Sequence, residues 1–190
     1  GDRFGWGSIQ LDGGIERVMD VAEAWFSDQS KVLHSEEVPL GALRIGLAAE
    51  GPIGEAGGSA LAALTQAFVG AGATVVVPES SSLLGQKSYW NGTVARGEFS
   101  PTIAYGQSPA LPGFHVMACP TSHWVETLTG LGGTGVDLVL VLAGEHGLQG
   151  HPLVPVVQVS EGDGTDFTED VDLVLGETDD NEKILRLVLD

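Results

Sequence analysis

Basic residues, cysteines and long apolar runs are all scarce in this chain. Its 190 residues include 8 lysines and arginines against 26 acidic residues, which gives a formal charge of −18 at pH 7. This charge repels phosphate backbones and anionic lipid surfaces, so nucleic acid and membranes are poor partners. It also slows the approach of an anionic substrate, unless a metal ion or a partner chain supplies local positive potential.

The single cysteine, Cys119, excludes an internal disulfide framework and fits a reducing compartment. No apolar stretch of the sequence approaches the roughly 20 residues that span a bilayer. The amino terminus also lacks the layout of a signal peptide. We therefore expect a cytoplasmic protein.

Glycine is abundant, and apolar runs are short and regularly spaced. The 28 glycines stand at the ends of these runs and form no low-complexity tract, and 43% of the residues are hydrophobic, as in a globular protein. A chain of this length is long enough for one domain with a substantial core. We expect one α/β domain over residues 1–190.

Apolar runs of strand length alternate with segments of helical spacing. The predicted strands cover residues 43–49, 74–77, 114–119, 136–142 and 154–159. The predicted helices cover residues 15–26, 59–72 and 181–190, and one more begins within residues 120–128, where Thr121 or Ser122 is a plausible cap. This alternation predicts a three-layer α/β fold with a mostly parallel sheet and helices on both faces. Residues 85–112 have weak periodicity and read as a long excursion that covers a site or contacts another subunit.

A glycine-rich loop at residues 51–58 follows the first predicted strand and invites comparison with phosphate-binding loops. It lacks the Lys-Ser/Thr pair of a P-loop and the glycine order of the dinucleotide fingerprint. Glu55 within it would oppose a phosphate group. Nucleotide binding is therefore a weak alternative, which rests only on the order of strand, glycine loop and helix.

Histidines and acids follow the predicted strands at their carboxyl ends, where ligands bind in open α/β sheets. Glu79 follows the second strand, His123 the third, and Glu145, His146 and His151 the fourth. Imidazole and carboxylate groups together suit a divalent transition metal, and they suit general acid–base chemistry near neutral pH equally well. The spacing of these residues does not decide between the two roles.

Each of these side chains also has a structural explanation. Glu79 is equally well a helix-capping acid, and His151 precedes Pro152, which restricts its backbone to extended forms. His115 lies inside a strand, where a satisfied structural histidine is the commoner case. Cys119 is a candidate nucleophile, but a small apolar residue at the end of a strand more often serves packing.

Six segments occur in the order in which a known enzyme family carries them: residues 9–14, 43–51, 71–79, 112–117, 128–130 and 135–150. With them, the chain from Ser8 onward resembles the carboxyl-terminal part of the altronate/galactarate dehydratases, which are sugar-acid hydro-lyases. Members of that family remove water from a sugar acid with the help of a divalent metal such as iron. They usually carry this region after an amino-terminal half and a small β-rich domain.

The resemblance implies a hydro-lyase that acts on a small hydroxy acid with a divalent metal, iron by family resemblance. We expect Glu79 and His123 to be the acid–base pair, with Glu145 and His146 as further catalytic groups. The expected metal ligands are His146, His151 and His123. The resemblance also implies an amino-terminal partner domain or chain, and a homo-oligomer is a further expectation.

Three motifs depart from the family pattern. Where the family commonly has Cys-Gly-Gly-Ser-Asp, this chain has Ala-Glu-Gly-Pro-Ile at residues 49–53. Where it has Thr-Thr-Gly-Arg-Gly, this chain has Leu-Ala-Gly-Glu-His at residues 142–146, and Met-Asp-Thr-Pro becomes Met-Ala-Cys-Pro at residues 117–120. Two hypotheses remain open: a divergent enzyme with a rebuilt site, or a catalytically silent domain for oligomerisation or ligand binding.

Overall fold

The computed structural model describes residues 15–17, 19–21, 23–24, 38–93, 101–144, 146–162, 170–175 and 180–189. The chain divides into two compact units, Gly1–Glu37 and Val38–Asp190. The described residues of the first unit are helical, in agreement with the helix predicted for residues 15–26. The α/β fold predicted over residues 1–190 is seen in the second unit, to which everything below refers.

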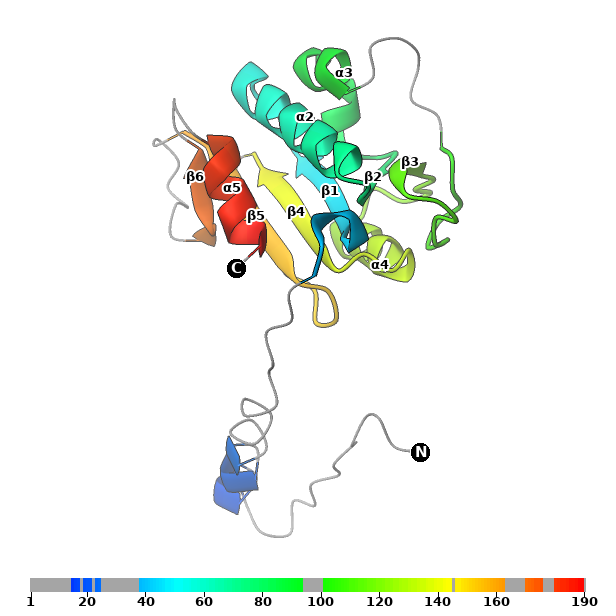
Figure 1. Cartoon of the computed structure of the whole chain (residues 1–190). Helices are drawn as coiled ribbons and strands as arrows, with labels where there is room; N and C mark the ends of the chain where they lie inside the picture. The colour runs from blue at the N-terminus through cyan, green and yellow to red at the C-terminus, as the bar shows by residue number, and fades with distance from the viewer. Residues whose placement is uncertain are drawn as a thin grey trace. The chain divides into compact units, whose positions relative to one another are not determined.

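The second unit is built on one sheet of six strands, all parallel, in the order β3-β2-β1-β4-β5-β6 (Figure 1). The predicted parallel sheet is therefore confirmed. The central strands are continuous apolar runs because they are covered on both faces. The strands are β1 (Arg44–Glu50), β2 (Thr74–Pro78), β3 (Gly113–Met117), β4 (Leu138–Ala143), β5 (Val156–Glu161) and β6 (Leu173–Leu175).

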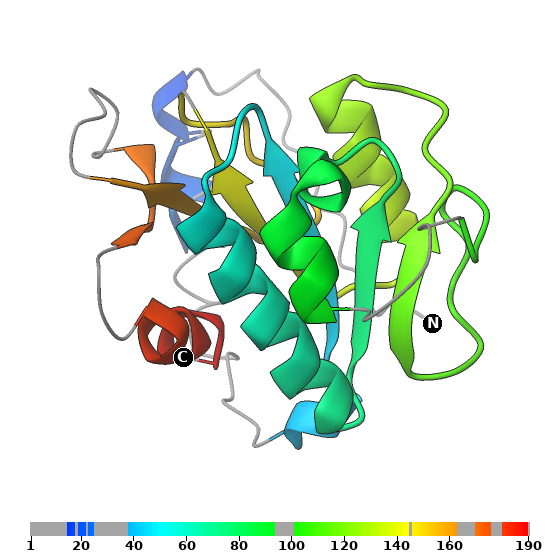
Figure 2. The same cartoon turned by 90° about the horizontal axis from the view of Figure 1, so that it is seen from above.

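Helices lie on both faces of this sheet, as predicted. Viewed from above in Figure 2, α2, α3 and α5 cover one face and α4 covers the other. The helices are α2 (Glu55–Gly70), α3 (Lys87–Thr93), α4 (Trp124–Gly133) and α5 (Asp180–Leu189), with the short 3-10 helices η2 (Leu40–Ala42) and η3 (Ser82–Gly85).

Each face has its own apolar core. The larger core contains the buried side chains Leu61 and Phe68 of α2, Tyr89 of α3 and Ile184 of α5. The smaller core is formed by Leu128 and Leu131 of α4 with strand residues and three loop residues, Ile103, Val136 and Val154. Among the described residues of the second unit, the α4 face is covered by one helix and by loops, which leaves more of it available for a site.

The chain reverses its direction across the sheet at β1. It builds β1, β2 and β3 outward to one edge, and α4 then carries it back across to β4 on the other side of β1. The carboxyl ends of β1 and β4 are therefore neighbours whose chains leave in opposite directions. This reversal is the place where open α/β sheets leave a crevice for a ligand.

Among the α-helices and strands, α3 and β6 were not predicted as such from the sequence. Helix α3 lies in the segment of weak periodicity, and its sequence KSYWNGT contains poor helix formers. It forms because Tyr89 is buried in the larger core and Gly92 lies so close to Ala62 of α2 that an added Cβ would be 2.7 Å away. Strand β6 has only three residues, too few to show a period.

No helix among the described residues is long and apolar enough to cross a membrane.

Candidate functional site

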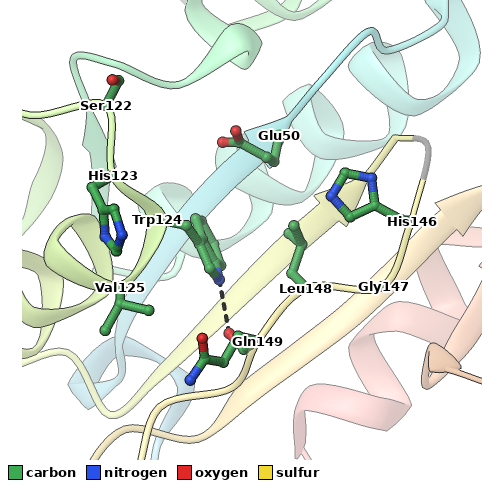
Figure 3. Close-up of a pocket in the computed structure, with 9 residues that line it drawn as sticks. All are labelled: Glu50, Ser122, His123, Trp124, Val125, His146, Gly147, Leu148 and Gln149. Carbon is green, nitrogen blue, oxygen red and sulfur yellow. Dashed lines mark hydrogen bonds between the residues drawn. The ribbon is translucent and has the colours of Figure 1, made fainter.

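A pocket of about 380 Å³ lies at the carboxyl edge of the sheet, where the chain reverses. Its walls come from the end of β1, the start of α4 and the loop after β4. It is lined by Glu50, Ser122, His123, Trp124, Val125, His146, Gly147, Leu148 and Gln149. In Figure 3, Glu50, Trp124 and Leu148 occupy the middle of the view, with His123 on one side and His146 on the other. The volume suits a small organic molecule.

Glu50 is the last residue of β1 and is paired in register with Ala143 of β4. Its backbone carbonyl accepts a hydrogen bond of 3.0 Å from the Gly144 amide. Glycine is required at position 144, because an added Cβ would lie 2.8 Å from the Glu50 carbonyl oxygen. Strand alternation places Ala49 against the larger core and Glu50 on the α4 face, so the carboxylate reaches the pocket.

His123 is the N-cap residue of α4, and its exposed side chain lines the pocket. Its backbone amide donates to Thr121 Oγ1 over 3.0 Å, which fixes the turn that leads into the helix. The His123 side chain makes no capping hydrogen bond with any part of the chain that the structure describes. The first amides of α4 therefore present the positive end of the helix dipole at the pocket.

His146 stands in the loop after β4 and is exposed at the opposite wall. This loop is tied down at two points. The Gln158 side chain of β5 accepts from the Leu148 amide over 2.6 Å and donates to the Leu148 carbonyl over 2.9 Å. The Trp124 indole donates to the Gln149 carbonyl over 2.8 Å, as Figure 3 shows. The segment that follows His146 is therefore held against α4 and β5.

The pocket combines one carboxylate, two imidazoles, one hydroxyl and the amino end of a helix. The described residues that line it include no lysine or arginine. Carboxylate and imidazole groups in one small pocket can take a proton from one atom of a ligand and give a proton to another. The arrangement is therefore suited to acid–base chemistry on a small molecule.

The structure brings two of the predicted site residues together, His123 and His146. Glu79 lies in the turn after β2 with its amide bonded to the Met117 carbonyl, and its exposed side chain does not line this pocket. His151 also lies outside the pocket lining. Glu145 is outside the described residues, so its predicted role stays a prediction.

His151 has a structural explanation in its hydrogen bonds. Its Nδ1 accepts from the Leu153 amide over 3.2 Å, so the neutral ring carries its proton on Nε2. That nitrogen lies 3.3 Å from Thr129 Oγ1, and the Thr129 hydroxyl donates in turn to the Val125 carbonyl. His151 thus ties the β4–β5 connection to the exposed side of α4.

His115 and Cys119 are also engaged in local structure. The His115 Nε2 atom lies 2.9 Å from the Leu111 carbonyl oxygen, as expected for a structural histidine. The Cys119 thiol donates to the Thr121 carbonyl over 3.3 Å and lies 3.5 Å from Thr127 Oγ1. The two Cys119 contacts fix the turn between β3 and α4.

The expected divalent metal finds no ready ligand set here. Within the described part of the chain, no three His, Cys, Asp or Glu side chains are grouped so as to hold a metal ion. Both ring nitrogens of His151 are engaged in contacts with Thr129 and Leu153. Glu145 lies outside the described residues, so the divalent metal stays a prediction, and we route no step through it.

The backbone amides of the glycine loop between β1 and α2 are already bound by a side chain of the same chain, Glu161. The Glu161 carboxylate, at the end of β5, accepts hydrogen bonds from the Gly54 and Gly57 amides at the start of α2. A bound phosphate would need these same amides. This contact weighs further against a nucleotide at the position where the sequence order suggested one.

Sequence reasoning missed Glu50, Trp124 and Gln149 as pocket residues. A usable signal existed for Glu50, because it follows a buried apolar run directly and precedes Gly51, as Glu145 and His146 follow another. The approach of Trp124 to Gln149 joins residues 25 apart and has no local sequence signal.

Compared with models of protein families, the chain matches none, and a search of curated proteins likewise finds no match.

Proposed function

We propose that this domain is a hydro-lyase that removes water from a small hydroxylated carboxylic acid of the sugar-acid class. The observation that carries the proposal is the placement of Glu50, His123 and His146 around one pocket at the chain reversal between β1 and β4. Elimination of water beside a carboxylate needs a base, an acid and a site for the negative charge. The pocket offers a group for each of these.

The substrate carboxylate binds at the start of α4. The open amides there favour an anion, and the His123 side chain lies beside them at the N-cap. This local arrangement offsets the repulsion that the charge of −18 exerts on an acid substrate. The corresponding place on α2 is filled by Glu161, so α4 is the better anion site of the two.

Glu50 then acts as the base and His146 as the acid. The Glu50 carboxylate takes the proton from the carbon that bears the substrate carboxylate and one hydroxyl, and negative charge develops on the carboxylate oxygens of the resulting enediolate. His146, on the opposite wall, gives a proton to the hydroxyl on the next carbon as that carbon–oxygen bond breaks, which releases water and leaves a neutral enol. The enol then rearranges to a 2-oxo acid, so atoms and charges balance.

The remaining wall suits the carbon chain of the substrate. The Trp124 indole, fixed by its hydrogen bond to Gln149, offers an apolar face, and Leu148 lies beside it. The Gln149 side chain and the Ser122 hydroxyl also line the pocket and can bond to substrate hydroxyls. By the resemblance, a cytoplasmic location and an amino-terminal partner domain or chain belong to the same proposal.

The test is a screen for 2-oxo acid formation from aldonic and aldaric acids, detected by hydrazone absorbance. It is run on the full chain with and without added Mg²⁺, Mn²⁺ or Fe²⁺. We expect Glu50→Gln to lower kcat by at least about 10²-fold and His146→Asn by a similar factor, because each removes a proton-transfer group. Glu55→Gln, an exposed acid at the start of α2 outside the pocket, is the matched control and should stay within about twofold.

Glu79→Gln separates the two candidate carboxylates. The resemblance favours Glu79 as the acid–base group and the geometry favours Glu50, so we expect the large loss from Glu50→Gln. Failure to form a 2-oxo acid from any substrate would overturn the proposal. In that case, saturable binding of a hydroxy acid that His123→Ala abolishes would favour the silent ligand-binding domain.

A further inference from the structure

The serines that follow β2 hold the end of β1 from the side opposite to β4. Strand β1 pairs with β2 only as far as Gly46, whereas its pairing with β4 continues to Glu50. The last residues of β1 therefore lie beyond the part of the strand that pairs with β2. At Ala49, the hydroxyls of Ser81 and Ser82 take the place of this pairing.

Ser81 satisfies both backbone groups of Ala49. Its Oγ accepts from the Ala49 amide over 2.9 Å and lies 3.3 Å from the Ala49 carbonyl oxygen, to which it donates. The same Oγ accepts from the Leu83 amide over 3.3 Å, which fixes the serine itself at the start of η3. Ser82 Oγ donates to the Ala49 carbonyl over 3.1 Å.

These bonds act one residue before the proposed base. Glu50 is held through its carbonyl by Gly144 on the β4 side, while its preceding residue is held by Ser81 on the β2 side. Ser81 is only 7% exposed, so water cannot easily replace its hydroxyl. The exposed Glu50 carboxylate thus projects from a backbone that is anchored on both sides.

Resting on the proposed function above, we infer that Ser81 is a positioning residue for Glu50, with Ser82 in a lesser role. It touches no part of the pocket and acts through the backbone of Ala49. Proton transfer depends steeply on the placement of the base, so a small shift of Glu50 lowers turnover. Binding of the substrate carboxylate at α4 does not depend on this contact.

The experiment is a double-mutant cycle on the full chain that combines Ser81→Ala with Glu50→Gln. Alone, Ser81→Ala should lower kcat by about tenfold or more with little change in KM, and Ser81→Thr, which keeps the hydroxyl, should restore most of the rate. In the Glu50→Gln background the same change should lower the residual rate by less than about twofold. A merely structural role would lower both backgrounds by the same factor, and that result would overturn the inference.

Two further variants guard against loss of folding. Ser82→Ala removes one of the two hydroxyls at the Ala49 carbonyl and should give a smaller loss with the same non-additivity. Ser88→Ala removes a buried hydroxyl of α3 that has no hydrogen-bond partner among the described residues, and it should leave kcat unchanged. If the wild type itself has no turnover, the proposed function fails and this inference with it. An active wild type with an additive cycle overturns the inference alone.

Discussion

The helices α2 and α4 start at the same edge of the sheet, but the first backbone amides of the two helices have different partners. The first amides of α2 are closed by the Glu161 carboxylate, which reaches over from β5. Those of α4 follow His123, which makes no side-chain cap within the described chain, and they face the pocket. The first backbone amides thus stabilise the fold in α2 and remain available for a ligand in α4.

The difference extends to the layers to which the two helices belong. On the α2 face, three helices enclose a large core that includes the fully buried Tyr89. On the α4 face, the cover beside the single helix is made of loops tied down by isolated bonds, such as that from Trp124 to Gln149. The closely packed layer on the α2 face, which we call the sealed layer, can hold the sheet rigid, while the layer on the α4 face accommodates the site.

Binding the first amides of α4 with a carboxylate, as Glu161 does for α2, should strongly weaken substrate binding at the pocket. In His123→Asp, an aspartate at the N-cap bonds to the free amides and places a negative charge where the substrate carboxylate is proposed to bind. We expect kcat/KM to fall about 100-fold, equivalent to about 2.7 kcal/mol. His123→Asn caps equally well without the charge and separates capping from repulsion. Both variants should unfold at a higher temperature than the wild type, because each gains a cap worth about 1 kcal/mol. A fully active His123→Asp protein would show that the start of α4 is not the anion site.

Opening α2 should have the next largest effect, on stability. Glu161→Gln keeps the shape of the side chain but leaves an amide NH₂ facing a backbone N–H donor. We expect a loss of about 2 kcal/mol in the free energy of unfolding, measured by urea denaturation. Glu55→Gln removes a charge at the same helix end and, among the described residues, no hydrogen bond to the helix amides, so it should cost less than about 0.5 kcal/mol. Equal losses in the two variants would mean that the Glu161 contact contributes only through its charge.

The sealed layer should also give a distinctive loss of stability at high pH. Burial raises the pKa of Tyr89 to about 12, although the bond to Thr65 opposes this. An unfolded tyrosine ionises near pH 10, so between pH 10 and 12 the unfolded chain binds fewer protons than the folded one. The contribution of Tyr89 to the free energy of unfolding is fully present below pH 10. It falls as the pH rises, by about 1.4 kcal/mol at pH 11. Unfolding curves of the wild type and Tyr89→Phe should diverge in slope over this interval, and parallel curves would contradict the burial argument.

The fold could be predicted from the sequence because its strands are apolar runs that carry their own signal. The run at residues 136–142 is β4 with a shift of one or two residues, and the pattern of strand and helix was sufficient for a parallel sheet. Helix α3 could not be predicted, because it depends on Tyr89 and Gly92 packing against α2 rather than on helical propensity.

The site was predicted only in part, for a physical reason. His123 and His146 follow strands and could be found from that position, and the same rule would have found Glu50. Whether a side chain enters the pocket depends on the face it takes and on its partners. His151 bonds to Thr129, and Glu79 stays in an exposed turn one strand away. Contacts between distant segments decide both outcomes.

The smallest predicted effect tests how tightly Glu161 fills the start of α2. An added Cβ at Gly57 would lie 2.6 Å from Glu161 Oε1 and 2.7 Å from Leu142 Cδ2, whereas at Gly70 of the same helix nothing lies within 4 Å. Gly70→Ala should therefore stabilise the protein by about 0.5 kcal/mol, because alanine has a higher helix propensity than glycine. Gly57→Ala should destabilise it by about 1 kcal/mol, because the cost of overpacking exceeds this gain in helix propensity. In a Glu161→Ala background the carboxylate no longer obstructs the methyl group, so the cost of Gly57→Ala should shrink while the gain from Gly70→Ala persists. If the cost of Gly57→Ala is unchanged in that background, Leu142 rather than the carboxylate limits the space, and the start of α2 is closed by apolar packing as much as by charge.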